Sequence, residues 1–246
     1  MGSRVLGILK VPREPSVTGM MIISYIGSVV ISRPSISTTV VSLLLVLLHL
    51  FSFDTIFDAI KIGRLGRRIV LLLLVNILPY IIILVLLPNI TRLLVSLLLL
   101  LLLLQYTILV VGLGSKHVVT MVMGSAIPVS SALIPALIEG EVTTSLVLFW
   151  GILTLYSIVT AIYVETRLAF RYIDRRIPLI LWFPSLLFTF IEPLLLVALI
   201  EPFTKLIYNI FSKVRLSDAR EIRRMGFIEL GRLILFVVVV VFILLT

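Results

Sequence analysis

The sequence predicts an all-α protein, a polytopic bundle of eight or nine transmembrane helices that forms one integral membrane domain over residues 1–246. Three observations support this prediction. Hydrophobic residues make up 61% of the chain and charged residues only 13%. Residues 97–104 are consecutive leucines, and similar apolar runs with few charges recur up to the last residue. Strands of a membrane barrel alternate apolar and polar residues, so these leucine runs favour helices.

The chain length sets the number of spans. A bilayer core about 30 Å thick requires roughly 20 apolar residues per helix, and a span with its loop uses roughly 25 residues. The 246 residues therefore accommodate eight or nine spans. Because the hydrocarbon offers no water to the backbone amides, each span is expected to be a closed helix. The apolar runs place the spans at about 17–32, 36–53, 69–87, 90–112, 118–138, 143–164, 177–191, 194–212 and 226–246.

Each of the first six spans has residues that indicate where it ends, where it bends or how it packs. The first run, from Val17, has no small-residue cleavage site followed by a polar domain, so it is expected to remain as a span. The second ends where charged residues begin, at Asp54, and Pro79 predicts a kink in the third. The fourth contains the leucine run. The fifth has small residues between Gly124 and Ala132, which suit close contact between helices, and the sixth ends at an arginine-rich loop.

Prolines predict further kinks, at Pro128 and Pro135 in the fifth span and at Pro184 in the seventh. The seventh and eighth spans also have an alternative, in which residues 177–200 form a single span followed by an amphipathic cytoplasmic stretch.

Two separate spans require a turn at residues 192–193 and place Pro202 in the eighth, between Glu201 and Lys205. These two charges, four residues apart, would then have to pair with each other. A broken or partly interfacial helix is the other interpretation of this segment.

Basic residues predict which side of the membrane each loop faces, because cytoplasmic loops are enriched in Lys and Arg. With the N-terminus in the cytoplasm, the external loops hold only two basic residues, Arg33 and Arg92, together with Glu139 and Glu141. Nine spans also return the basic segment 213–224 to the cytoplasm and leave the C-terminus external, so nine is the favoured count. The loops after the second, fourth and sixth spans hold Lys61, Arg64, Arg67, Arg68, Lys116, Arg167, Arg171, Arg175 and Arg176.

Charge, cysteine content and histidines exclude several classes of protein. Basic loops that face the anionic cytoplasmic leaflet explain the net charge of +9, and no basic and aromatic face for nucleic acid exists outside the spans. The absence of cysteine excludes disulfides, cysteine-ligated iron–sulfur clusters and cysteine nucleophiles. A bis-histidine haem needs both ligands at matched depth, and His117 is too superficial to pair with His49. No cofactor is therefore expected.

Asp54 and Asp58 are the candidate ligands for a metal or a diphosphate. They lie four residues apart, so both carboxylates project from one face of a helix, where they can hold Mg²⁺ and, through it, a diphosphate. A solvated, salt-bridged helix end is the alternative interpretation. Nearby basic residues are candidates for direct binding of a phosphate or a lipid headgroup: Lys61, Arg64, Arg67, Arg68, Arg167 and Arg171.

The remaining carboxylates suggest other roles. Glu165 and Asp174, nine residues apart, fall on opposite sides of a continuous helix, so they are not expected to form a second metal site. Glu165 with its neighbouring arginines predicts an anchoring charge cluster instead. Glu229 and Arg232, three residues apart, are expected to neutralise each other. Ionisable residues inside a membrane are functional candidates by default, and here they are Glu192, Glu201, Glu229 and Arg232.

Three segments, in this order, resemble the YwiC-like family of bacterial and archaeal membrane proteins. Residues 11–14 (Val-Pro-Arg-Glu) resemble the Pro-basic-Glu-His-Gly opening of that family, although residues 15–16 are Pro-Ser where the family has His-Gly. Residues 150–167 begin with Trp and end with Tyr-Val-Glu-Thr-Arg, and residues 225–230 are Met-Gly-Phe-Ile-Glu-Leu. The resemblance extends over nearly the whole chain and implies an integral membrane protein without an established activity.

The UbiA superfamily of intramembrane prenyltransferases is a more distant resemblance. Its members have nine helices, with aspartate-rich motifs in the cytoplasmic loops after the second and the sixth. Asp54 and Asp58 match the spacing of the first motif, with Leu50 at its asparagine position, while the second motif lacks its carboxylate pair. Because diphosphate ionisation requires Mg²⁺ held from both sides, the resemblance implies a UbiA-like fold whose activity is lost or changed.

These observations support two classes of function. The first is a non-catalytic accessory or anchor subunit of a larger membrane complex, for example a respiratory one, with membrane lipids and other membrane subunits as partners. The second is a UbiA-like lipid or isoprenoid-diphosphate binding protein or prenyltransferase, with Mg²⁺ at Asp54 and Asp58. A small-solute transporter with proton sites at Glu192 and Glu201 ranks third.

Overall fold

The computed structural model describes residues 15–62, 66–212 and 214–246, and the elements in them are helices. The long helices are α1 (Pro15–Ser32), α2 (Ile36–Ile62), α3 (Arg67–Leu86), α4 (Ile90–Leu113), α8 (Thr144–Arg167), α10 (Leu195–Phe211) and α11 (Ala219–Leu245). The short ones are α5 (Val118–Gly124), α6 (Ala126–Val129), η2 (Ser130–Leu133), α7 (Ile134–Glu139), α9 (Ile177–Trp182) and η3 (Phe183–Phe190). The all-α prediction is therefore confirmed.

Some residues used in the sequence argument lie outside the described part of the chain. They are the opening segment 11–14 of the family resemblance, the N-terminal basic residues, Arg64 and Lys213. Lys61 belongs to α2, but its side chain is also outside the described residues.

Six helical segments of the described chain are long and apolar enough to cross a membrane, which supports a polytopic membrane protein. Their composition explains this property, since each contains a long window with few charged residues. The segments are Ile36–Ala59, Arg67–Leu86, Ile90–Leu113, Val118–Glu139, Thr144–Arg167 and Ala219–Leu245. The helices of residues 17–32 and 177–190 are apolar but shorter.

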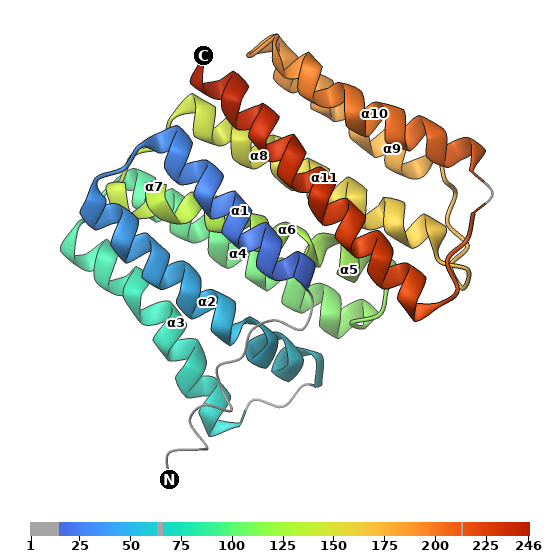
Figure 1. Ribbon diagram of the computed structural model, residues 1–246. Coiled ribbons are helices and arrows are strands. Elements are labelled where there is room, and N and C mark those ends of the chain that lie inside the picture. The colour runs from blue at the N-terminus through green and yellow to red at the C-terminus, as the bar shows by residue number, and fades with distance from the viewer. Residues whose placement is uncertain (1–14, 63–65, 213) are drawn as a thin grey trace.

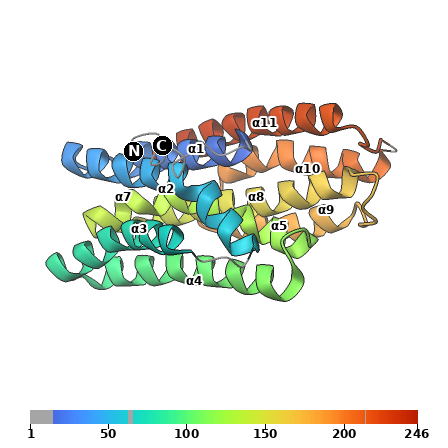
Figure 2. The ribbon, with the colours of Figure 1, turned by 90° about the horizontal axis from the view of Figure 1, so that it is seen from below.

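The helices run alternately between two ends of one bundle (Figure 1). One end gathers the connections at residues 33–35, 87–89, 140–143 and 191–194, together with the C-terminus. The other end gathers the connections at 114–117, 168–176 and 214–218. Seen from below, α3 and α4 lie along one flank, α11 lies along the opposite flank, and α8 lies between them (Figure 2). Helices α1 and α11, which are far apart in the sequence, lie side by side.

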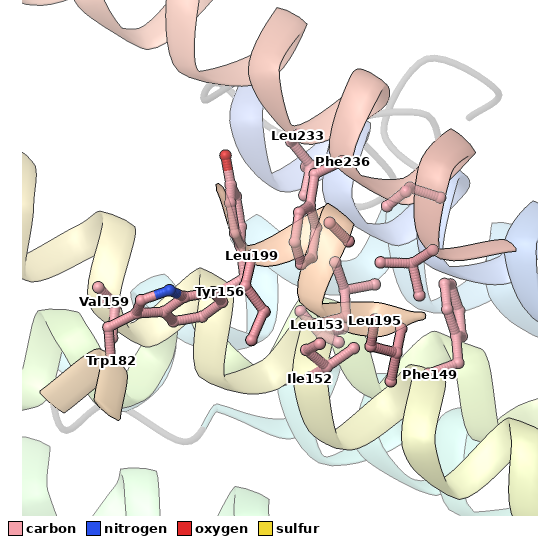
Figure 3. Packing of buried hydrophobic residues seen from close by; sticks show 14 of the residues in the cluster. Phe149, Ile152, Leu153, Tyr156, Val159, Trp182, Leu195, Leu199, Leu233 and Phe236 are labelled. Carbon is pink, nitrogen blue, oxygen red and sulfur yellow. The ribbon is translucent and has the colours of Figure 1, made fainter. Parts of the chain in front are cut away.

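The main core surrounds α8, which is buried along almost its whole length. Tyr156 of α8 stacks on Phe236 of α11 with ring centroids 4.3 Å apart, and Trp182 of α9 meets both rings edge-on (Figure 3). Trp182 and Tyr156 are essentially inaccessible to solvent. Large aromatic side chains from three helices therefore fix the position of α8 among its neighbours.

Small residues bring α1 and η2 into close contact, as the sequence predicted for the fifth span. Ser28 Oγ donates a hydrogen bond to the carbonyl of Ala132 at 2.5 Å, and Ser131 Oγ donates one to the carbonyl of Met21 at 2.8 Å. All three small side chains are buried. Hydroxyls that bond to a backbone carbonyl on the neighbouring helix hold the two segments together where no large side chain fits.

Several predicted boundaries shift. Helix α2 continues past Asp54 to Ile62, because Ile56 and Phe57 keep the apolar spacing and pack against Tyr106 of α4. Helix α11 begins at Ala219 rather than at residue 226, since Ile222 and Met225 also face the core. Apolar contacts with other helices thus extend both helices beyond the first charged residue.

Proline accounts for the broken segments. The fifth predicted span is divided into α5, α6, η2 and α7, with Pro128 in α6 and Pro135 at the start of α7. The seventh changes from α9 to the 3₁₀ helix η3 next to Pro184. Since η3 ends at Phe190 and α10 begins at Leu195, the alternative of a single helix over residues 177–200 is wrong. Helix α10 itself continues through Pro202 without a break.

Candidate functional site

A cavity of about 340 Å³ lies between α2, α3, α4 and the α5–α7 segment. Its volume falls at the lower end of the range typical of small-molecule sites. The wall is largely apolar, and none of the described residues that form it is charged. Its polar members come from four elements and are His49, Ser52, Asn76, Tyr80, Ser96, Ser130 and Ser131.

A hydrogen-bonded group joins α2 to α3 at the cavity wall. Ser52 Oγ donates to Asn76 Oδ1 at 2.9 Å, and Asn76 Nδ2 donates to the carbonyl of Leu72 at 2.8 Å. His49 Nε2 and the Tyr80 hydroxyl form a further hydrogen bond, and the two rings are stacked. These side chains are uncharged hydrogen-bonding groups in an apolar surrounding, so the wall can accommodate a ligand with a neutral polar group.

Two polar atoms of the wall residues have no hydrogen-bond partner in the structure, Nδ1 of His49 and Oγ of Ser96. Asn76 is also an interacting neighbour of the imidazole ring. A buried polar group without a partner costs about 1–3 kcal/mol.

The cavity reaches the molecular surface between α3 and α4. Its wall includes Ile81 of α3, which is 51% exposed, and Leu97 and Leu100 of α4, which are 44% and 56% exposed. These exposed wall residues are apolar and lie on α3 and α4, two helices long and apolar enough to cross a membrane.

The carboxylates Asp54 and Asp58 do not line this cavity. The α2 residues that do line it, such as Ser52, Ile56 and Phe57, occupy another face of the helix. Both aspartates have interactions of their own within the structure, so neither is free. Arg67 and Arg68 are exposed at the start of α3. Within the described ranges, no three His, Asp or Glu side chains come together as metal ligands.

A second polar site, a cluster of four charged side chains, lies between α10 and α11. Lys205 Nζ is 2.9 Å from Glu229 Oε2, and Glu229 Oε1 is 2.7 Å from Arg232 Nη1. Arg232 Nε is 3.4 Å from Glu201 Oε1. Lys205 and Glu229 are buried, whereas Arg232 and Glu201 lie at the rim. The two positive and two negative charges cancel.

Helix α8 covers the ammonium of Lys205. Its Nζ lies 5.0 Å from the centre of the Tyr156 ring and 4.9 Å from that of Tyr163, and 3.4 Å from Thr160 Oγ1. Aromatic faces and a carboxylate both stabilise a buried cation. The cluster therefore joins three helices, α8, α10 and α11, through one lysine.

These contacts correct one prediction and confirm another. The expected pairing of Glu201 with Lys205 within α10 is wrong, because α11 brings Glu229 to the buried side of Lys205 and Glu201 is left at the rim with Arg232. The expected pair of Glu229 and Arg232 is confirmed. The contact between Lys205 and Glu229 could have been found from the sequence, because opposite charges in two neighbouring spans are expected to pair.

Glu192 lies in the turn between η3 and α10, at the place where nine spans require a turn. Its intramembrane position stays a prediction. Its Oε1 accepts a hydrogen bond from the amide of Leu194 at 3.4 Å. Among the loop residues, Glu165 forms an ion pair with Arg171 at 2.9 Å, in agreement with the expected charge cluster, and Asp174 Oδ1 accepts from the amide of Arg176.

Searches with this chain find no matching protein-family model, curated protein or solved structure. The resemblances to the YwiC-like family and to the UbiA superfamily therefore stay predictions from sequence.

Proposed function

We propose that this protein is a multi-pass membrane protein that binds a lipid-like molecule in the cavity between α2 and α7. The observation that supports it is the cavity itself, which has an apolar wall, a neutral polar group at His49 and Tyr80, and an opening between α3 and α4. A site with these properties suits a molecule that partitions into the bilayer and carries an uncharged hydrogen-bonding group.

We also propose nine crossings with the basic end in the cytoplasm, that is, the end whose connections carry Lys116, Arg171 and Arg215. The alternating helices in Figure 1 support nine passages if α9 with η3 and α10 each count as one. Helix α10 has 17 residues, which rise about 25 Å and are short for a complete span. Its charged residues face α8 and α11, which supports an intramembrane position.

Cavity filling tests the proposed binding. Ser96→Phe would occupy the cavity without breaking a hydrogen bond, because Ser96 Oγ has no partner. Val85→Phe is the matched control, since Val85 is 71% exposed and does not line the cavity. Each protein would be purified in mild detergent and its extracted lipids identified by mass spectrometry. The proposal expects one apolar species at stoichiometric amount in the wild type and in Val85→Phe, and its loss in Ser96→Phe. Equal amounts in all three would refute it.

A second candidate is the accessory or anchor subunit of a larger membrane complex. It is supported by α3, in which only Leu72 and Asn76 are buried, so that most of this helix is available to lipid or to another subunit. Mass spectrometry of the same detergent preparation tests it through stoichiometric partner proteins. A lone monomer would count against it.

The diphosphate alternative, with Mg²⁺ at Asp54 and Asp58, has less support. The two carboxylates lie off the cavity wall, and the wall has no charged side chain among its described residues. The double variant Asp54→Asn/Asp58→Asn tests this alternative. If Mg²⁺ raises the thermal stability of the wild type but not of the double variant, the two aspartates bind the metal and this alternative is supported.

A further inference from the structure

The loops that follow α8 and α10 form one continuous surface at the basic end of the molecule. The amide of Leu216 donates to the carbonyl of Arg167 at 2.7 Å, and the amide of Ala169 donates to the carbonyl of Leu216 at 2.9 Å. These two bonds fix the loops side by side, although they are far apart in the sequence. Arginines from both loops are thereby placed on one surface.

Three of these arginines are held by neutral acceptors. Arg167 Nε donates to Asn209 Oδ1 at 3.1 Å. Arg175 Nη2 donates to the carbonyl of Val214 at 2.8 Å, and Arg215 Nη1 donates to the carbonyl of Arg171 at 2.9 Å. Each bond orients a guanidinium while leaving its charge uncompensated.

The ion pairs of the described residues leave these three charges without a carboxylate. Arg171 differs, because Glu165 neutralises it at 2.9 Å and its Nη2 donates to the carbonyl of Lys116. The sequence suggested both Arg167, the last residue of α8, and Arg171 as phosphate ligands; Arg167 has an uncompensated charge and Arg171 does not.

The three guanidiniums are also close enough to affect one another. Partial burial, followed by the charges of Arg215 and Arg167, lowers the pKa of Arg175. Arginine still stays protonated at neutral pH, so the repulsion remains in the folded protein. An anion among the three groups would relieve it.

The surroundings favour a lipid as the source of that anion. Phe170 and Tyr172 in the same loop are 63% and 93% exposed, and Arg215 lies over the Tyr172 ring at 5.9 Å. Exposed aromatic and basic residues next to apolar helices are typical of the interface between membrane and water. Anionic headgroups are concentrated there on the cytoplasmic side.

We propose that Arg167, Arg175 and Arg215 bind the phosphate of an anionic phospholipid headgroup. Guanidinium groups bind phosphate oxygens through two parallel hydrogen bonds, which suits this arrangement. The site is separate from the cavity between α2 and α7 and does not depend on it.

The test uses a double variant that combines Arg175→Gln and Arg215→Gln. It is compared with a control double variant that has the same net charge. The control is Arg220→Gln with Arg224→Gln, two exposed residues at the start of α11. Full-length proteins in neutral phosphatidylcholine and detergent micelles would be titrated with phosphatidylglycerol, with thermal stability as the readout. The wild type and the control are expected to gain stability at the same lipid concentration. The double variant should need at least about tenfold more lipid, since two charge-assisted bonds are lost.

Two outcomes would overturn the proposal. One is an equal response of the double variant and the control, which would show general charge attraction. The other is a full response of the wild type to inorganic phosphate alone, which would identify free phosphate as the ligand and exclude the lipid. If the glutamine variant does not fold, Arg175→Lys with Arg215→Lys replaces it. That variant keeps the charge and loses the paired bonds, so weaker binding is again expected.

Discussion

Glu229 accepts hydrogen bonds from two cations, Lys205 at 2.9 Å and Arg232 at 2.7 Å. Its carboxylate is buried, and Lys205 depends on it for a negative partner, because the other neighbours of Lys205 are the rings of Tyr156 and Tyr163 and a hydroxyl. Arg232 has a second carboxylate, that of Glu201. Loss of Glu229 therefore affects Lys205 more than Arg232.

Glu229→Gln is expected to destabilise the protein by about 3–5 kcal/mol, because it leaves the charge of Lys205 buried without a partner. Lys205→Met should be milder, since Glu229 keeps Arg232. Glu201→Gln should cost less than Glu229→Gln, because Arg232 keeps the carboxylate of Glu229 at 2.7 Å and Glu201 lies at the rim of the cluster. Unfolding in detergent, followed by circular dichroism, measures all three. An equal loss in Glu201→Gln and Glu229→Gln would contradict the assigned partners.

Ser96 provides a contrasting case. Its hydroxyl is buried without a partner, so Ser96→Ala is expected to leave stability unchanged or to raise it slightly. Ser28→Ala removes the bond to the carbonyl of Ala132 and should cost about 0.5–1.5 kcal/mol. The same unfolding assay compares the two, and a larger loss in Ser96→Ala would show that its hydroxyl has a partner.

At the level of elements, close packing of helices depends on residues that have no side chain. A Cβ atom at Gly27 of α1 would overlap the ring of Phe149 on α8, whereas Gly112 of α4 faces open space. Gly27→Ala is expected to cost about 1–3 kcal/mol through overpacking, and Gly112→Ala to gain about 0.5–1 kcal/mol through helix propensity. Thermal unfolding checks both. A stabilising Gly27→Ala would mean that α1 and α8 are further apart than described.

Most elements could be predicted from the sequence, because lipid requires long apolar helices and charges mark their ends. The ends of α4 and α8 agree with prediction within a few residues. The extension of α2 to Ile62 could not be predicted, since it depends on contact with Tyr106 from a distant helix. The cavity was not predictable either, because its wall combines side chains from α2, α3, α4 and the α5–α7 segment. Periodicity within one helix does not show which face meets which neighbour.

At the level of the whole molecule, the chain divides into a densely packed part and an open part. The core around α8 buries large aromatic side chains from α9 and α11 (Figure 3). Helices α3 and α4, on the opposite flank, bury few residues and form the opening of the cavity. The dense part is suited to hold the bundle together, and the open part is suited to admit a molecule from the bilayer.

The proposed topology can be tested directly, because the chain contains no cysteine. Lys116→Cys and Glu141→Cys would place single thiols in connections at opposite ends of the bundle. In intact cells, an impermeant maleimide is expected to label Glu141→Cys and to reach Lys116→Cys only after lysis. The reverse pattern would invert the orientation, and labelling of both in intact cells would contradict a membrane-spanning bundle with these ends.

The most direct test of the proposed binding site is photolabelling in lipid nanodiscs with a long-chain alcohol that carries a diazirine in its tail. Peptide mass spectrometry would locate the labelled residues. If the cavity binds such a molecule, labels are expected on cavity residues of α2 and α4, such as Phe53 and Leu103. These labels should be lost in Ser96→Phe but not in Val85→Phe. Labels spread evenly over lipid-facing residues such as Val85 and Phe242, and unchanged by Ser96→Phe, would contradict binding in the cavity.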